Sequence, residues 1–156
     1  MSGNLITKEG YEQLNEKLYR MQSVDRREVI AEIARARESG NLDENHEYIH
    51  AQQAQEKLES NISNLVSFME NCQIVDVSSP SMGDRVEFGS TVTIRNLDTE
   101  AVAKWQLVGV TEFDIKEGKI SYKSPIGLAM MGKRDGEDFE VITPRGEQYW
   151  EIEKIH

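Results

Sequence analysis

The sequence is poor in cysteine and has no long apolar run, and each shortage excludes a class of protein. Cys72 is the only cysteine among 156 residues, so no intramolecular disulfide can form and a reducing compartment fits best. No apolar run approaches membrane-spanning length, and the first residues do not resemble a secretion signal. We therefore expect a cytoplasmic protein without a membrane partner.

Positive charge is also scarce. The chain has 18 Lys and Arg against 28 Asp and Glu, which gives a net charge of -10. Nucleic-acid affinity depends on neutralising phosphates with Lys and Arg, so this balance argues against a free-standing nucleic-acid binder. Apolar positions nevertheless recur regularly, which predicts a folded chain, and a length of 156 residues allows one domain or two small ones.

The first half of the chain has the apolar spacing of helices. Thr7 is a plausible N-cap for a first seam. The seam slips by one residue across Gln22 to Arg27, which indicates either one helix with a local adjustment or two helices. Its members are Tyr11, Leu14, Leu18, Met21, Val29, Ile33 and Ala36.

A second seam follows without a break at alternating spacings of three and four. Such heptads require a partner helix, and a short turn supplies one from the same chain, running antiparallel. The members of this seam are Tyr48, Ala51, Gln55, Leu58, Ile62, Leu65, Met69 and Cys72.

The stretch between the seams, residues 40–48, is rich in acids. Gly40 suits a helix end, and Asn41 or Asp43 can cap the next helix. Asp43, Glu44 and Glu47 then place carboxylates at the positive end of that helix. We expect a helical hairpin with an acidic tip, although caps and solvated charges would account for the same acids.

The second half of the chain alternates like strands. Ser78-Ser79-Pro80 marks the boundary, which predicts domains at 1–77 and 78–156. Pro125 to Met131 is expected to form one short helix, closed by Gly132. The fold class is therefore α+β, an antiparallel coiled-coil hairpin followed by a small antiparallel sheet. The expected strands are 85–88, 91–95, 103–109, 119–122, 139–143 and 149–155.

Two lookalike motifs are set aside on chemical grounds. His46-Glu47-Tyr48-Ile49-His50 matches the zinc-protease pattern H-E-x-x-H, but the sequence offers no suitable third ligand near this pair and a slender hairpin offers no substrate cleft. Residues 127–134 resemble a phosphate-binding loop. However, Arg134 replaces the hydroxyl that would bind Mg²⁺, and the intervening residues are typical of a buried helix.

The chain resembles the bacterial Gre factors, the GreA/GreB group of transcript cleavage factors, over nearly its whole length. The matched segments follow the same order in the chain and are therefore specific. They are Ala34–Tyr48, Gln73–Asp76, Val86–Asp98, Ser124–Gly127 and Thr143–Glu147.

The resemblance implies a coiled coil followed by an FKBP-like domain that docks on RNA polymerase at its secondary channel. Tip acids then help to hold a second Mg²⁺, shared with the polymerase, for hydrolysis of backtracked RNA. Glu44 matches the family's tip glutamate, and Tyr48 would brace the tip. Ser124, Pro125 and Ile126 resemble the polymerase-contacting segment.

Further expectations follow from the same resemblance. Arg35 and Arg37 are weaker candidates for steering the RNA 3′ end, although they could simply solvate the helix or pair with neighbouring acids. We expect a monomeric accessory factor with no cofactor of its own, which stimulates cleavage by the polymerase rather than acting as an enzyme.

One tip position departs from the family pattern. This chain has Asn41 where the family has an acid, and an amide oxygen coordinates Mg²⁺ without adding charge. Cleavage should therefore be reduced unless Asp43 compensates. Otherwise the protein would occupy the channel and regulate the polymerase without cutting. Alternatives from other classes are an FKBP-like prolyl isomerase or chaperone, and a plain protein-interaction rod.

Overall fold

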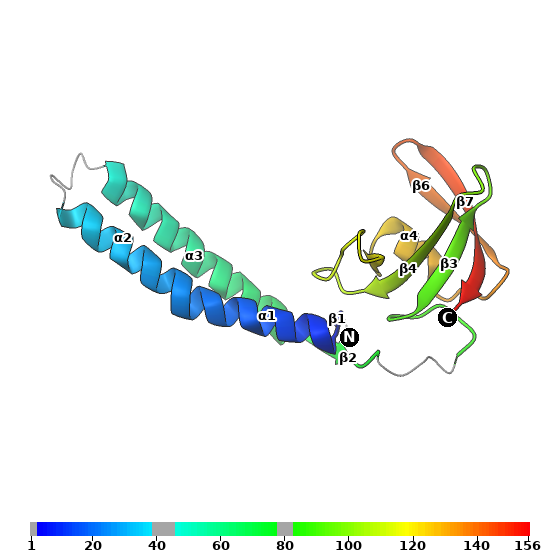
Figure 1. The fold of residues 1–156 in the computed structure, drawn as a ribbon, viewed down its shortest axis with the longest axis horizontal. Coiled ribbons are helices and arrows are strands. Elements are labelled where there is room, and N and C mark those ends of the chain that lie inside the picture. The colour runs from blue at the N-terminus through cyan, green and yellow to red at the C-terminus, as the bar shows by residue number, and fades with distance from the viewer. Residues whose placement is uncertain (1–2, 39–45, 78–82) are drawn as a thin grey trace. The chain divides into compact units, whose positions relative to one another are not determined.

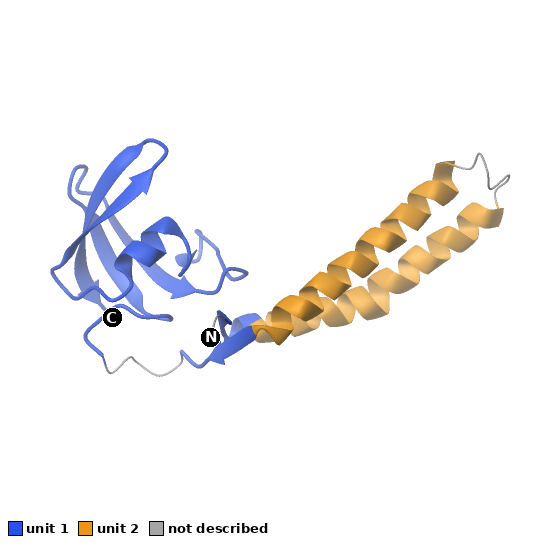
Figure 2. Cartoon of the chain, turned by 180° about the vertical axis from the view of Figure 1, so that it is seen from behind, with its two compact units in different colours: residues 1–10, 72–156 blue, residues 11–71 orange. Residues whose placement is uncertain are grey.

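The chain forms two compact units in a computed structural model, which describes residues 3–38, 46–77 and 83–156. One unit comprises residues 11–71, and the other combines residues 1–10 with 72–156 (Figure 2). Residues 3–10 and 72–77, predicted within the helical domain, thus belong to the unit that contains the larger sheet. No helix in the described parts of the chain is long and apolar enough to span a bilayer.

The helical unit is an antiparallel hairpin, as expected (Figure 1). One arm consists of α1 (Lys8–Arg20), the π-helical turn η1 (Met21–Asp25) and α2 (Arg26–Glu38). The other arm is α3 (His46–Glu70). The arms differ in regularity because only the first contains the phase slip.

The π turn explains the one-residue slip in the apolar spacing of the first seam. Met21 and Val29 are eight residues apart instead of seven, so an unbroken α-helix would rotate one of them out of the seam. A π turn closes its hydrogen bonds over one additional residue and absorbs the excess. The residues flanking η1, Arg20 and Arg26, keep right-handed helical dihedrals. This confirms one helix with a local adjustment rather than two helices.

Both seams face the interior of the hairpin. Leu14, Met21 and Ala36 are buried on the first arm, and Ala51, Ile62 and Met69 on the second. The remaining predicted seam residues of the two arms are half-buried. The prediction of Cys72 as the last residue of the second seam is wrong, because α3 ends at Glu70 and Cys72 begins β2.

A salt bridge joins the arms beside η1. Arg26 donates from Nε and Nη2 to the two carboxylate oxygens of Glu59, at 2.8 and 2.9 Å. These hydrogen bonds lower the pKa of Glu59 and raise that of Arg26. The pair's stabilisation is therefore present above the ordinary pKa of a glutamate and is lost as pH falls through the lowered value.

A two-stranded parallel pair lies at the start of the hairpin and was not predicted. It joins β1 (Asn4–Thr7) to β2 (Cys72–Val75), with Ile6 opposite Ile74. Thr7 caps α1 as expected, because its Oγ1 accepts the Gly10 N–H at 3.0 Å.

The larger sheet has five strands in the order β5-β4-β3-β7-β6. The α+β class is confirmed, but the sheet is mixed rather than fully antiparallel, because β4 and β5 pair in parallel. Its core includes Val92, Ile94, Leu107, Met130 and Ile152. The strands are β3 (Thr91–Asn96), β4 (Val102–Val108), β5 (Lys119–Ser121), β6 (Asp138–Thr143) and β7 (Gly146–Ile155), with the helix α4 (Pro125–Met130) between β5 and β6.

The predicted strand at 85–88 is wrong. Arg85 makes an isolated bridge with Arg134, and no strand extends from it. Val86 instead donates its N–H to Lys133 O and accepts the N–H of Gly132, so its backbone is satisfied by the segment after α4. The alternating pattern arose from burial of Val86 in the core rather than from a ladder.

One carboxylate makes several of the hydrogen bonds that hold β1 to the rest of its unit. Glu112 accepts hydrogen bonds from Thr7 N at 3.0 Å, from Gly109 N at 2.9 Å and from the Thr7 hydroxyl. We call the set Thr7, Gly10, Gly109 and Glu112 the Glu112 clamp.

Candidate functional site

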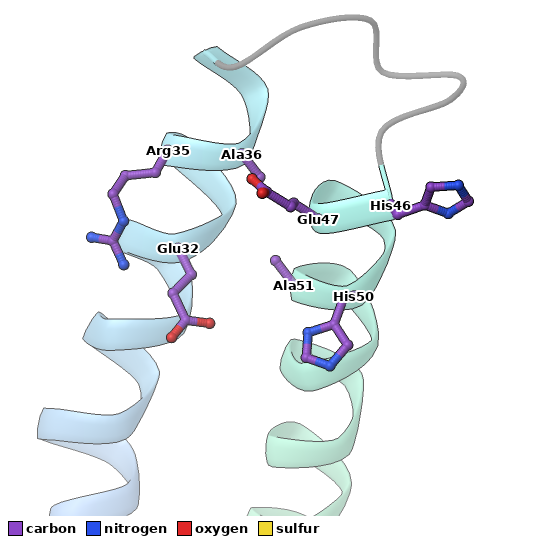
Figure 3. Close-up of a pocket in the computed structure, with 7 residues that line it drawn as sticks. All are labelled: Glu32, Arg35, Ala36, His46, Glu47, His50 and Ala51. Atoms are coloured by element: carbon purple, nitrogen blue, oxygen red, sulfur yellow. The ribbon is translucent and has the colours of Figure 1, made fainter.

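The described residues closest in sequence to the acidic tip form an open groove between the end of α2 and the start of α3 (Figure 3). Its volume is about 480 Å³. Ala36 and Ala51 are only 5% and 4% exposed, so small side chains let the two helices approach here. The lining residues are Glu32, Arg35, Ala36, His46, Glu47, His50 and Ala51.

The charged groups of the groove point in different directions. Glu47 extends from α3 toward α2, whereas His46 points away from α2 (Figure 3). Arg35 points away from α3 in the same view, although it borders the groove. The groove therefore has acidic and basic side chains that point in different directions and do not converge on one binding point.

Arg37 has a different role from Arg35. Its guanidinium carbon lies 5.7 Å from the centroid of the Tyr48 ring, a cation–π contact that joins the last turn of α2 to the first turn of α3. Gln52 Nε2 donates to Tyr48 Oη at 2.9 Å and fixes the phenol from the same helix. Tyr48 thus braces this end of the hairpin, as its place in the seam predicted.

Replacing Arg37 by alanine is expected to lower the free energy of unfolding of the hairpin by about 0.5–1 kcal/mol, the usual worth of an exposed cation–π contact. Chemical denaturation followed by circular dichroism at 222 nm measures the change. The matched control is Arg35→Ala, which removes an equal charge two residues away without a ring contact. Equal effects of the two variants would show that the Tyr48 contact contributes nothing.

The three predicted tip ligands, Asn41, Asp43 and Glu44, lie outside the described residues. Their neighbours in sequence are described on both sides, up to Glu38 and from His46. The carboxylate–amide set therefore stays a prediction from the sequence.

The zinc-protease lookalike is not supported by its surroundings. His46 and His50 both lie on α3 and both border the groove. Within residues 3–38, 46–77 and 83–156, no group of three or more His, Cys, Asp or Glu side chains is placed to hold a metal ion.

The segment Ser124–Ile126 begins α4. Ser124 is the N-cap, and its Oγ accepts the Gly127 N–H at 3.1 Å and donates to Ser121 O at 2.7 Å. Pro125 is exposed at the first helical position, whereas Ile126 packs against the sheet core. Of the predicted contact residues, Pro125 is therefore the one presented to solvent, and Leu128 beside it is 60% exposed.

The same helix argues against a phosphate-binding loop at residues 127–134. Residues 125–130 are helical, and a Cβ on Gly127 would lie 2.4 Å from Ser121 O. This glycine serves tight packing rather than a phosphate cradle.

The aromatic residues of the sheet unit are largely committed to its core. Phe139 is buried, Trp105 and Trp150 pack against the core cluster, and Phe88 meets Tyr122 edge-on with ring centroids 5.2 Å apart. An isomerase pocket would need such rings along an open cavity, so this packing does not favour the isomerase reading.

Sequence reasoning missed Glu112, which organises the clamp. Thr7 and Glu112 are 105 residues apart, and a lone glutamate in a loop gives no periodic signal. It also missed the exposure of Leu128, because apolar residues in a short helix were all expected to be buried.

Two family models match the chain, one for each half. Residues 4–74 match the N-terminal transcription elongation factor model, and residues 80–156 match the model for the C-terminal part of the transcription elongation factors GreA/GreB.

Full-length relatives give the same result. The transcription elongation factor GreA of Rhodopseudomonas palustris strain TIE-1 is 45% identical over 96% of this chain and 94% of its own. That of Phenylobacterium zucineum is 44% identical over 96% and 95%. Among solved structures, the GreA factor homolog 1 of Thermus thermophilus is 25% identical over 99% of both chains, with a TM-score of 0.44.

Proposed function

The chain belongs to the GreA/GreB family of transcription elongation factors, and from this membership we propose that it enters the secondary channel of bacterial RNA polymerase and stimulates cleavage of backtracked RNA. The observation that carries the proposal is the match of both halves of the chain to the family. An antiparallel hairpin whose two arms are joined by the acidic stretch supports it.

The donor set of the tip suits the ion that this reaction uses. Asp43 and Glu44 carry carboxylates and Asn41 an amide oxygen, and Mg²⁺ prefers such hard oxygen ligands while often retaining several waters. When bound, a second Mg²⁺ stabilises charge on the attacking or leaving oxygen of phosphodiester hydrolysis. Glu44 and Asp43 would supply the negative charge that recruits it, and Asn41 a neutral oxygen.

The hairpin supplies stiffness. The Arg37–Tyr48 contact and the buried pair Ala36 and Ala51 hold α2 and α3 together close to the tip. A ligand set works best when the elements that carry it are rigid, because small misplacements are costly. Arg35 and Arg37 add positive charge next to the acids, where the 3′ end of a backtracked RNA would lie.

The sheet unit serves as the docking part in this proposal. Pro125 and Leu128 present apolar surface on α4, and Lys123 stands beside them. Ser124 contributes by shaping the start of the helix through its two hydrogen bonds. The protein acts as a monomer and has no cofactor of its own, and the polymerase supplies the catalytic centre.

The decisive experiment is a cleavage assay on a backtracked polymerase complex, with and without the protein, over a series of Mg²⁺ concentrations. The proposal expects faster release of short RNA, with the largest gain at low Mg²⁺. Binding without faster cleavage would instead identify a channel-occupying regulator, and absence of binding would overturn the proposal. A peptide isomerisation assay on the same preparation tests the isomerase alternative.

Replacing Asn41 by aspartate is expected to raise stimulated cleavage, because a third carboxylate strengthens attraction of the cation. The gain should be up to about 10-fold, the lower end of what a supporting ligand contributes to metal affinity. Rates measured at limiting Mg²⁺ report it. Asn61→Asp makes the same charge change on an exposed position of α3 and serves as control. An equal gain in both variants would show that the effect comes from the net charge of the protein and not from a ligand at position 41.

A further inference from the structure

The Glu112 clamp concentrates hydrogen bonds on one side chain. Its carboxylate accepts the Thr7 N–H at 3.0 Å, the Thr7 hydroxyl and the Gly109 N–H at 2.9 Å. The Thr7 hydroxyl oxygen in turn accepts the Gly10 N–H at 3.0 Å and so caps α1. One carboxylate is thus bonded both to its own loop and to the residue from which the hairpin's first helix starts.

Two glycines leave room for this carboxylate. A Cβ on Gly10 would lie 2.4 Å from Glu112 Cδ, and a Cβ on Gly109 would lie 2.7 Å from Leu5 O and 2.9 Å from Glu112 Oε2. Gly10 lies within the first turn of α1, a position at which glycine weakens a helix relative to alanine. Close approach to Glu112 explains why a helix-weakening residue stands there.

Neighbouring contacts continue the attachment along β1. Leu5 donates its N–H to Tyr122 Oη at 3.0 Å, and Lys123 Nζ donates to Asn4 Oδ1 at 2.7 Å. Tyr122 and Lys123 directly precede Ser124, so the segment that grips β1 leads into α4. Thr7 is 5% exposed and Glu112 is partly buried, so water competes less for these hydrogen bonds than it would at an exposed site.

We propose that Glu112 is a positioning residue for transcript cleavage: by holding Thr7 and Gly10 within the sheet unit, it fixes the first turn of α1, from which the first arm of the hairpin continues. The proposal rests on the function proposed above. Glu112 touches neither RNA nor metal in this role and acts only through the start of α1. Its loss should therefore impair cleavage within the bound complex rather than binding itself.

The test compares clamp variants with matched controls in the full-length protein. Glu112→Ala removes all three hydrogen bonds to the carboxylate, whereas Thr7→Val removes only the two made by the hydroxyl and keeps that of the backbone N–H. Thr7→Ser keeps the hydroxyl, and Glu117→Ala removes a carboxylate from an exposed position of the same loop. Cleavage is measured at saturating protein, and polymerase affinity from the concentration that gives half the effect. Glu112→Ala should slow saturated cleavage about 10- to 100-fold, as small misplacements of reacting groups do. Its half-saturating concentration should stay close to that of the wild type.

Gly10→Ala perturbs the same contact from the side of α1 rather than from Glu112. Its methyl group should displace the Glu112 carboxylate and slow cleavage in the wild-type background, but have no further effect in the Glu112→Ala background. Helix propensity alone would make the substitution neutral or favourable in both. Hydrogen exchange of the Thr7, Gly10 and Gly109 amides, followed by NMR without polymerase, should accelerate in Glu112→Ala and remain slow in Thr7→Ser and Glu117→Ala.

The outcomes separate the two proposals. Wild-type protein that leaves cleavage unchanged overturns the proposed function, and with it the positioning role. Stimulated wild-type cleavage with an equally active Glu112→Ala overturns the positioning role alone. So does a loss confined to affinity, or a loss that follows the unfolded fraction at the assay temperature. Slow saturated cleavage at wild-type affinity, with faster exchange at the clamp amides, supports it.

Discussion

Replacing Glu44 by alanine is expected to lower stimulated RNA cleavage about 10- to 100-fold, because even supporting ligands contribute that much to the hold on a metal ion. Alanine leaves Asp43 as the only carboxylate of the proposed ligand set and Asn41 as a neutral donor. Since the tip already lacks one acid of the family pattern, removing Glu44 leaves little negative charge to attract the ion. Binding to the polymerase should persist, because the proposed docking residues Pro125 and Leu128 are untouched.

The dependence on Mg²⁺ distinguishes a ligand from a structural residue. If Glu44 helps to hold the ion, raising the Mg²⁺ concentration should restore part of the lost rate. Glu56→Ala makes the same change in net charge at an exposed position of α3 and should leave the rate unchanged. Unchanged cleavage in Glu44→Ala, or an equal loss in Glu56→Ala, would remove Glu44 from the mechanism.

Ile94→Ala is expected to destabilise the sheet unit by about 2–5 kcal/mol, the range for truncating a buried isoleucine. Ile94 is fully buried on β3, the central strand, where it pairs with Ala103 of β4 and Ile152 of β7. Lost burial and a residual cavity both contribute. A loss of this size is a large part of the stability of an ordinary domain, so polymerase binding should weaken at elevated temperature.

The two units can be followed separately in this experiment. Both tryptophans, Trp105 and Trp150, lie in the sheet unit, so their fluorescence reports its unfolding, while circular dichroism at 222 nm mainly reports the hairpin. Val102→Ala is the control: this valine is 59% exposed on β4, and truncation there should change stability by less than about 0.5 kcal/mol. Equal effects at positions 94 and 102 would contradict the assignment of the core.

The helical half was predicted closely because its information is local. Heptad spacing placed both seams, and the displaced phase near Gln22 already indicated an irregular turn. The connection expected from Gly40 and the acids after it lies outside the described residues and stays a prediction. In the second half, five of the six expected strands and the helix after Ser124 formed near their expected positions.

The failures share a physical cause, which is contact between distant parts of the chain. Pairing of β1 with β2 joins residues 4–7 to 72–75, and neither segment alone signals a parallel partner. Val86 alternates like a strand residue, yet its backbone bonds go to residues 132 and 133. Glu112 meets Thr7 across most of the sequence. Hydropathy patterns record which face is buried, but not what covers it.

The candidate site residues were predicted mainly from the family resemblance and less from the spacing and chemistry of the residues themselves. Helix-end chemistry accounts for acids at positions 43, 44 and 47 without any role in metal binding, and only the family match favours ligands over caps. The docking segment shows the reverse. The family match grouped Ser124, Pro125 and Ile126, and the structure divides them into a cap, an exposed residue and a core residue.

The π turn makes the hairpin tolerant of a change in chain length. A variant with one residue fewer between Met21 and Arg26 would close this stretch as ordinary α-helix, with Val29 and Ile33 still facing α3. Deletions at that point would leave the distal end in register, whereas the same deletion inside α3 would rotate every later apolar side chain off the seam. Evolutionary insertions and losses should therefore accumulate in the first arm and spare the second.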